Sequence, residues 1–576
     1  MNVNVLGKSN MWFLTGSGLV NTVVFAFILL SLGFIAGLTL SIWQFPTAVT
    51  LTLLVNFFAA RQLIPGAFLP SFIRSSMIIL IIIIISIYIS GFFFDISADG
   101  QLYHMESAIR MLGGWNPFKK ELPLDYNQAI WLNHYGKGVE DPQATIYALT
   151  KKLETTKSTN FILLAGSFCL SQSFLIRLNR FSFRKNLLFG TLLALNPVTI
   201  YQLLNTYVDG QLSSFLLCFI FVGGLIYLDA NRQYLILLAS ILIILINIKF
   251  TALVFAAVFT IGMLIVFYVG KKRRAFRRAF IVCAIASAFS IGVVGYFPYV
   301  INTVQYHDAM YPGLKVLRKE ALKFTPLSFV HKNQMSKFII SFFSHTDNLH
   351  FSTTMDPVIK SKIPFTLNKT DIFNASKPFV VFMAGMGPFF SGIFISSLLI
   401  FGYFLWRMKA WKSGLPFIIT GSTILFSVLI ISEGWYARYV PQLWFIPIFL
   451  LMASELYRSK VVDRIRNALY FIMLVNISFC FASFPYVYYK SAQIKYELNQ
   501  LKASQQTIRV QFSYFTSNRT RFTENEIPFL EDSIPEGMAV EMANSPTKII
   551  PPSPMPDIPK PWILKAGEQI VKHLHL

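Results

Sequence analysis

Two aspartates follow the most hydrophobic stretch of the sequence, which runs from Met77 to Phe94. Asp95 and Asp99 therefore come where a membrane-spanning helix is expected to end. A carboxylate at that depth is costly unless it has a partner or a chemical task. Because a carboxylate can accept a proton from a hydroxyl group, Asp99 is predicted to be a general base, with Asp95 as the second candidate. Alternatively, the pair could hold a divalent cation, or Asp99 could only cap the helix that follows.

The residues after Asp99 predict a short amphipathic helix that lies on the membrane surface. Its apolar positions recur at helical spacing and form one face: Leu102, Met105, Ile109 and Leu112. Asp99 stands at the N-cap position, and the glycine pair at 113–114 ends the helix. The polar edge, with His104 and Arg110, would then lie over the site.

The motif reads Asp99, three residues, then Tyr103-His104, and a Gly-Trp-x-Pro stretch follows at 114–117. This pattern resembles the first external loop of the GT-C glycosyltransferases, which are polytopic membrane enzymes that take a sugar from a polyprenyl-phosphate carrier. The resemblance covers residues 95–118 and implies an inverting enzyme in which Tyr103 and His104 contact the sugar or the phosphate. The alternative is that both rings belong to the aromatic belt at a membrane surface.

The composition is that of an integral membrane protein. Of the 576 residues, 54% are hydrophobic and 13% are charged, and the mean hydropathy is +0.55. The net charge of +23 comes from Lys and Arg in short gaps between apolar runs, as the positive-inside rule expects, so no nucleic-acid partner is predicted. The four cysteines lie inside apolar runs and predict neither disulfides nor metal ligands.

The apolar runs predict an all-α polytopic membrane protein of GT-C-like architecture with about thirteen transmembrane helices. Their approximate ranges are 18–41, 46–60, 75–94, 160–176, 186–205, 211–228, 233–247, 249–270, 279–300, 380–406, 415–432, 442–457 and 467–488. The basic loops place the amino terminus in the cytoplasm, so loops 95–159 and 301–379 are expected to be external. Residues 1–490 would form the transmembrane module. Residues 491–576 would form an external C-terminal region, too poor in apolar residues for a large core of its own.

Two cations near span ends are candidates for binding a lipid phosphate. Lys249 lies in the sequence Asn-Ile-Lys-Phe-Thr at 247–251, and Arg438 lies in an Arg-Tyr-x-Pro element. Both elements are similar to sequences of GT-C enzymes. A cation at such a depth is costly unless it meets an anion, and a guanidinium can bind phosphate through two N–H groups. Alternatively, Lys249 extends to the membrane surface and Arg438 pairs with Glu433.

Asp209 and His307 complete the candidate set of substrate-binding residues. Asp209 begins an Asp-Gly-Gln sequence that repeats residues 99–101, and it could bind the acceptor or the sugar. Asp-Gly is also common in a solvated turn. His307 opens the large loop 301–379 and could line the site, or it could be an ordinary surface histidine. The sequence contains no phosphate-binding loop, dinucleotide fingerprint or Ser-His-Asp motif, which suits a donor that arrives already activated in the membrane.

Together these patterns predict a membrane glycosyltransferase that moves a sugar from a polyprenyl-phosphate carrier to a glycan, lipid or protein acceptor. The enzyme is expected in a bacterial cytoplasmic membrane with its site on the outer face, and no cofactor is predicted beyond the alternative divalent cation. Two other functions stay open. A polysaccharide polymerase or O-antigen ligase would rely on external arginines and a histidine. A transporter of lipid-linked sugars would need charges in mid-span, and the sequence shows no inverted repeat.

Overall fold

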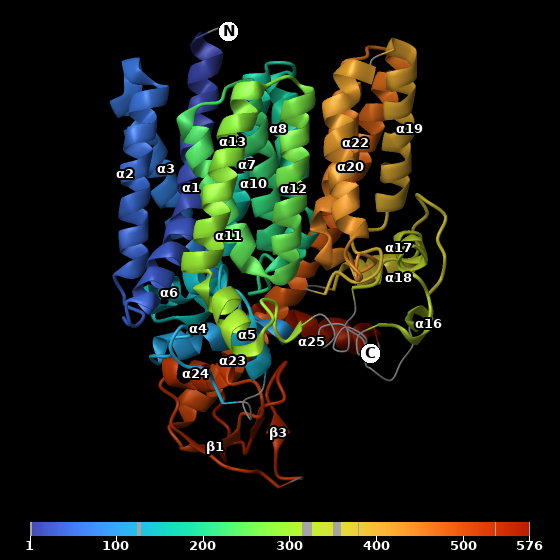
Figure 1. Ribbon diagram of the computed structural model, residues 1–576. Coiled ribbons are helices and arrows are strands. Elements are labelled where there is room, and N and C mark those ends of the chain that lie inside the picture. Colours follow the sequence, from blue (N-terminus) through green and yellow to red (C-terminus); the bar gives the residue numbers. More distant parts are fainter. Residues whose placement is uncertain are drawn as a thin grey trace.

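The computed structural model describes residues 3–123, 128–313, 325–348, 359–377, 380–409, 411–535 and 537–574. A bundle of roughly parallel helices stands above a layer of short helices and loops, and most of the C-terminal region lies beneath that layer (Figure 1). The helices of the bundle are α1 (Val3–Ile35), α2 (Gln44–Leu63), α3 (Phe68–Ser90), α7 (Ser158–Leu178), α8 (Phe183–Ala194), α10 (Asp209–Leu228), α11 (Arg232–Ile248), α12 (Phe250–Val269), α13 (Arg273–Phe289), α19 (Phe390–Met408), α20 (Trp411–Leu429), α21 (Phe445–Ser454) and α22 (Lys460–Phe481).

Within these described ranges, eight helices are long and apolar enough to cross a membrane, so the chain is a predominantly helical integral membrane protein. Three shorter apolar helices lie in α11, α20 and α21. The span predicted at 186–205 is broken. Asn196 caps the separate helix α9 (Pro197–Tyr201) by accepting a hydrogen bond from the Val198 N–H at 2.9 Å. Pro197 has no N–H with which to continue α8.

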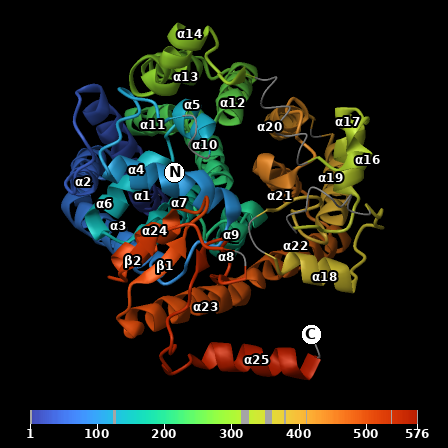
Figure 2. The same ribbon diagram turned by 90° about the horizontal axis from the view of Figure 1, so that it is seen from below.

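The bundle has a larger part, α1–α13, and a smaller part, α19–α22 (Figures 1 and 2). The two parts are in contact, since α12 packs against α20 and α8 against α21. Trp444 is fully buried in this junction and donates a hydrogen bond from Nε1 to the Leu192 carbonyl at 2.7 Å. One continuous hydrophobic core therefore spans both parts.

We call one end of the bundle the loop end, because it carries most of the short helices. These are α4 (Met105–Leu112), α5 (Ala129–His134), α6 (Glu140–Thr150), α9, α14 (Ile301–Tyr306), α16 (Leu327–Val330), α17 (Gln334–Phe342) and α18 (Lys369–Ala375). The 3-10 turns η3 (Leu153–Lys157) and η6 (Ala437–Tyr439) lie there as well. The opposite end carries the turn between α12 and α13.

The C-terminal region begins as α22 continues into α23 (Ser483–Ser504). Its four-stranded sheet has the order β2-β1-β4-β3 and is formed by β1 (Ile508–Gln511), β2 (Phe529–Glu531), β3 (Val540–Glu541) and β4 (Lys548–Ile549). α24 (Ser517–Glu524) packs on this sheet through Phe522, and α25 (Trp562–Leu574) lies beside α23 (Figure 2). Phe94 and Ile96 of the loop end pack against its core. Residues that follow α3 thus complete the small hydrophobic core of the C-terminal region.

Candidate functional site

Four charged side chains meet at the loop end, and each comes from a different segment. Arg438 Nη2 donates to Asp99 Oδ2 at 3.0 Å, and Arg438 Nε lies 3.8 Å from Asp209 Oδ2. Lys249 Nζ donates to Asp209 Oδ1. Acids and bases therefore alternate in the order Asp99, Arg438, Asp209, Lys249. We call these four residues the charge cluster.

Arg438 lies among three tyrosine rings. Its guanidinium carbon is 4.9 Å from the ring centroid of Tyr207 and 5.1 Å from those of Tyr436 and Tyr439, so cation–π attraction helps to hold it. Burial raises the pKa of all three hydroxyls, which therefore stay protonated. Arg438 Nε is buried and has no hydrogen-bond partner among the described residues. Arg438 Nη2 donates to Asp99 and Tyr439, whereas Nη1 makes no hydrogen bond with the described residues, so the two N–H groups of Nη1 are left for a ligand.

Asp99 does not cap the helix after it, so that part of the sequence prediction is wrong. Its φ of −59° and ψ of −35° are helical, and its side chain makes no capping hydrogen bond. Its Oδ2 pairs with Arg438, whereas its Oδ1 has no hydrogen-bond partner in the described part of the chain. The side chain is 27% exposed. Asp99 therefore presents one carboxylate oxygen that a hydroxyl group could approach.

Asp95 is in the opposite situation and is fully buried. Its Oδ1 accepts from the N–H of Ser97 at 2.8 Å and from its hydroxyl at 2.6 Å. Its Oδ2 accepts from the N–H of Thr206 at 2.8 Å and from its hydroxyl at 2.7 Å. A Cβ on Gly100 would come within 2.5 Å of Asp95 Oδ2, so only glycine fits there. Asp95 thus ties two loops together.

The predicted pairing of Asp95 with Asp99 around a divalent cation does not fit these contacts. Each carboxylate oxygen of Asp95 already accepts two hydrogen bonds, so neither oxygen is available to bind a cation together with Asp99. Within the described ranges, no three or more His, Cys, Asp or Glu side chains are grouped to hold a metal ion.

The helix after Asp99 packs its predicted apolar face against the hydrophobic core through Met105, Ile109 and Leu112, but its buried surface extends beyond that face. The buried residues are Gln101, His104, Met105, Ala108 and Met111 among others, whereas Leu102, Ile109 and Leu112 are half-buried. Residues 100–104 form a π-helical turn, which holds one more residue than an α turn and so rotates the buried face. The helix ends at Leu112, and Gly114 follows with a φ of +93°, as the glycine pair predicts.

His104 and Tyr103 lie next to the charge cluster but differ in exposure. His104 is buried, and its Nδ1 lies 2.7 Å from Glu140 Oε1 at the start of α6. The ring centroids of Tyr103 and His104 are 4.2 Å apart. Burial, aided by the charge of Asp99, raises the pKa of the Tyr103 hydroxyl well above its ordinary value. Arg110 pairs with Glu106 at 2.6 Å.

Glu140 belongs to a group of buried charges that sequence reasoning missed. Burial alone would raise the pKa of Glu140, but the hydrogen bond and charge of His104, with Lys137, hold that pKa below its ordinary value. Asp141 is also fully buried, and its Oδ2 accepts from the Ser31 hydroxyl at 3.2 Å. The available signal was the sequence Gly-Lys-Gly-Val-Glu-Asp-Pro at 136–142, where three charges stand between glycines and a proline.

Lys249 stands in an extended break between α11 and α12, with φ −167° and ψ 163°. The loop that carries Glu140 supports this break, because the Gly138 N–H donates to the Asn247 carbonyl at 2.8 Å. A Cβ on Gly138 would lie 2.9 Å from that carbonyl, which explains the glycine. The first loop therefore positions Lys249 as well as Asp99.

The two Asp-Gly-Gln sequences meet at Arg438. Asp99 and Asp209 each begin one of them, and both face the guanidinium. Gln202 Nε2 donates to Asp209 Oδ2 at 3.1 Å. The predicted alternative partner of Arg438, Glu433, is not the one observed, since the Ser432 hydroxyl donates to Glu433 instead.

His307 does not join the charge cluster, so of its two predicted roles, lining the site or lying at the surface, the second is observed. It lies exposed after α14 in a left-handed conformation with φ +54°. His134 occupies a more enclosed position, with its Nδ1 3.1 Å from Asn302 Oδ1 and its ring centroid 4.6 Å from that of Tyr311. Burial lowers the pKa of His134. The residue type alone does not predict which of these two histidines is enclosed.

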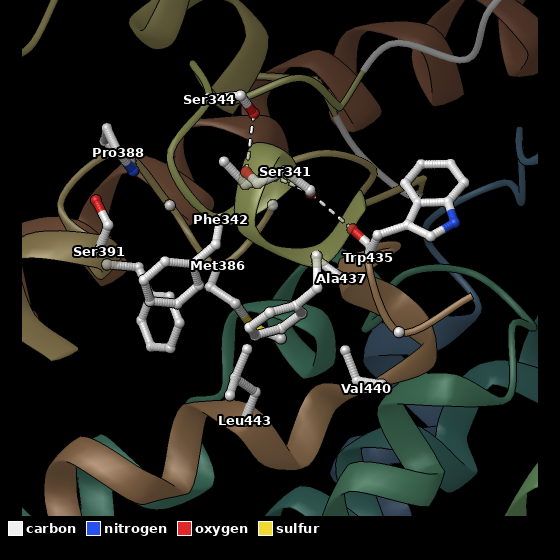
Figure 3. A pocket seen from close by; sticks show the side chains of 16 residues that line it. Ser341, Phe342, Ser344, Met386, Pro388, Ser391, Trp435, Ala437, Val440 and Leu443 are labelled. Carbon is white, nitrogen blue, oxygen red and sulfur yellow. Dashed lines mark hydrogen bonds between the residues drawn. The ribbon is translucent and has the colours of Figure 1, made fainter. Parts of the chain in front are cut away.

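A largely apolar pocket lies beside the segment that carries Arg438 (Figure 3). None of the predicted site residues lines it, but Ala437, next to Arg438 in the chain, does. Ser341 closes one side by donating from its hydroxyl to the Trp435 carbonyl at 2.7 Å. Other lining residues are Phe338, Phe342, Met386, Phe390, Val440 and Leu443.

Comparison of the chain with protein-family models, curated proteins and solved structures finds no match.

Proposed function

We propose that this protein is a GT-C-like, inverting glycosyltransferase that moves a sugar from a polyprenyl-phosphate carrier to a glycan, lipid or protein acceptor. The observation that carries the proposal is the charge cluster. A partly open carboxylate and two cations, which lie far apart in the sequence, come together at the loop end of a membrane protein. Transfer from a lipid phosphate needs such groups, namely a base for the acceptor and cations for the leaving phosphate.

Asp99 acts as the general base in this proposal. Arg438 fixes one carboxylate oxygen, and the other is left to accept the proton of the acceptor hydroxyl. The acceptor oxygen then attacks the anomeric carbon while the bond from that carbon to the phosphate oxygen breaks. A single displacement of this kind inverts the anomeric centre, as the resemblance implies.

Lys249 and Arg438 bind the phosphate that leaves. Arg438 Nη1 makes no hydrogen bond with the described residues, and the hydrogen bond found for Lys249 uses only one of its three N–H donors. Asp209 holds both cations in place and offsets part of their charge.

The position of the site suits a substrate that stays in the bilayer. The charge cluster lies at the end of apolar helices, and the Lys and Arg asymmetry of the sequence favours the outer side of a bacterial cytoplasmic membrane for that end. Tyr103, with its protonated hydroxyl, and His104 remain candidates for contacts with the sugar.

The test is sugar transfer by the purified protein. A panel of short-chain polyprenyl-phosphate sugars is offered with a membrane extract as the source of acceptors, and the release of polyprenyl phosphate is measured. The parent protein should release it from at least one donor, and Asp99→Asn should release it 10²- to 10⁴-fold more slowly, as loss of a general base implies. Asp229→Asn, an exposed aspartate that pairs with Arg177, is the control. Failure of the parent with every donor, or an unchanged rate in Asp99→Asn, would refute the proposal.

A further inference from the structure

The C-terminal region places one arginine inside the loop end. Arg521, in α24, is only 2% exposed, and all five of its N–H groups donate hydrogen bonds. Nε and Nη2 donate to Glu154 Oε1 at 2.9 and 2.6 Å, and Nη2 also donates to the Asp95 carbonyl at 2.9 Å. Nη1 donates to Gln101 Oε1 and to Asn518 Oδ1, both at 2.9 Å.

Two of these partners lie on either side of Asp99 in the sequence. Asp95 precedes it by four positions and Gln101 follows it by two, so a single guanidinium holds both flanks. Glu154 adds a further tie, because its Oε2 accepts the backbone N–H of Asp95 at 2.8 Å. The segment that presents Asp99 is therefore fixed from the side of the C-terminal region.

Three further hydrogen bonds join the C-terminal region to the loop end beside Arg521. The Thr516 hydroxyl donates to Glu106, and the Ser517 hydroxyl donates to Gln101 Oε1 at 3.4 Å. The Leu153 N–H donates to Glu524 Oε1 at 2.8 Å. A buried ion pair adds little net stability compared with apolar residues of the same volume. These buried hydrogen bonds are therefore better explained by the fixed positions that they give to the bonded residues than by stability.

We propose that the C-terminal region is part of the catalytic unit, with Arg521 as a positioning residue for the segment 95–101. The proposal rests on the proposed function in so far as Asp99 is the base. A displacement of about 1 Å at a reacting group can cost roughly 100-fold in rate, so loss of the hydrogen bonds of Arg521 is expected to lower kcat.

The test uses the full-length protein with Arg521→Lys, which keeps the charge beside Glu154 but cannot make five hydrogen bonds. Hydrogen–deuterium exchange of residues 95–106 should rise in this variant, and kcat should fall about tenfold with an unchanged KM for the donor. Arg509→Gln is the matched control, because Arg509 lies in the same region and pairs with Asp532 at the surface. It should match the parent in both measurements.

Gln101→Met removes one acceptor of Arg521 while keeping the side chain's length, and it serves as the second variant if Arg521→Lys does not fold. In Gln101→Met, exchange of residues 95–106 should rise and kcat should fall, both by less than in Arg521→Lys. Unchanged exchange at 95–106, or exchange raised equally throughout the chain, would overturn the positioning role. Faster local exchange with an unchanged kcat would overturn the link to catalysis. If the parent transfers no sugar, the proposed function fails, and the exchange result alone decides whether Arg521 fixes the segment.

Discussion

At the scale of single residues, two aspartates four positions apart have opposite environments. Asp95 is fully buried, and its oxygens accept four hydrogen bonds. Asp99 has one ion pair and one open oxygen, and its side chain is 27% exposed. Only the second arrangement leaves a carboxylate able to take a proton from a substrate. Asp95 is therefore better assigned to holding the loop than to chemistry.

This contrast predicts different effects for the two Asp→Asn substitutions. Asp95→Asn puts an NH2 group against donors of Ser97 or Thr206 and loses hydrogen bonds to a charged group, each worth about 1.5–3 kcal/mol. It should lower the midpoint of thermal unfolding in detergent, whereas Asp99→Asn should leave that midpoint near the parent's. A stable Asp95→Asn protein, or an unstable Asp99→Asn protein, would contradict the assignment.

The cations of the charge cluster are predicted to bind the carrier phosphate. Lys249→Gln and Arg438→Gln should each weaken the binding of a short-chain polyprenyl phosphate by about 1.5–3 kcal/mol, which is roughly ten- to a hundredfold. Arg438→Lys should recover part of the loss, since it restores charge without the planar fork. Titration calorimetry measures the affinities, and Arg274→Gln, an exposed arginine at the opposite end of the bundle, is the control. Parent-like affinity in both Gln variants would rule out the phosphate role.

At the scale of elements, interruptions of helices place the side chains of the candidate site. Lys249 stands in the break between α11 and α12, and Asp209 begins α10 after the separate helix α9. The π turn at 100–104 directs His104 toward Glu140. α24 then packs against α4 and η3, which brings the C-terminal region to the same place. Regular helices alone would have kept these side chains apart.

The contact of α24 with η3 is predicted to weaken as the pH rises. Burial, with the nearby charge of Glu154, raises the pKa of Glu524 from its ordinary 4.5 to about 7. Between these values only the docked form holds the proton, so the docked state loses stability as the pH rises from 4.5 to about 7. The total is roughly 3 kcal/mol for a shift of this size.

Hydrogen–deuterium exchange of residues 517–527 between pH 5 and 8, corrected for intrinsic rates, measures this effect. Protection should fall as the pH rises in the parent and should not depend on pH in Glu524→Gln. Glu526→Gln is the control, because Glu526 pairs with Lys502 at the surface. If Glu524→Gln keeps the pH dependence of the parent, another group is responsible.

At the scale of the whole molecule, the charge cluster lies where the two parts of the bundle meet. Asp99, Asp209 and Lys249 come from the larger part, and Arg438 comes from the smaller one. The ion pair between Asp99 and Arg438 joins residues 339 positions apart. A change in the packing of the two parts would therefore alter the cluster directly.

The orientation of the molecule is predicted from its basic loops. A cysteine that replaces Val540, which is 52% exposed, should react with a membrane-impermeant maleimide in intact cells. A cysteine in place of Lys272, exposed at the opposite end, should react only after permeabilisation. The four native cysteines are buried, so the background is low. Labelling of Lys272→Cys in intact cells would put the charge cluster on the cytoplasmic side.

The sequence by itself determined the helical membrane class and the candidate charges at the ends of spans, because hydropathy and the cost of burying a charge are local properties. It could not determine which aspartate is open, because the partners of Asp95 include Thr206, 111 positions away. Nor could it show that Arg438 pairs with Asp99 rather than Glu433, or that Arg521 bonds to the Asp95 carbonyl across 426 positions. Hydrogen bonds between distant segments depend on how helices pack, and only the tertiary structure decides that.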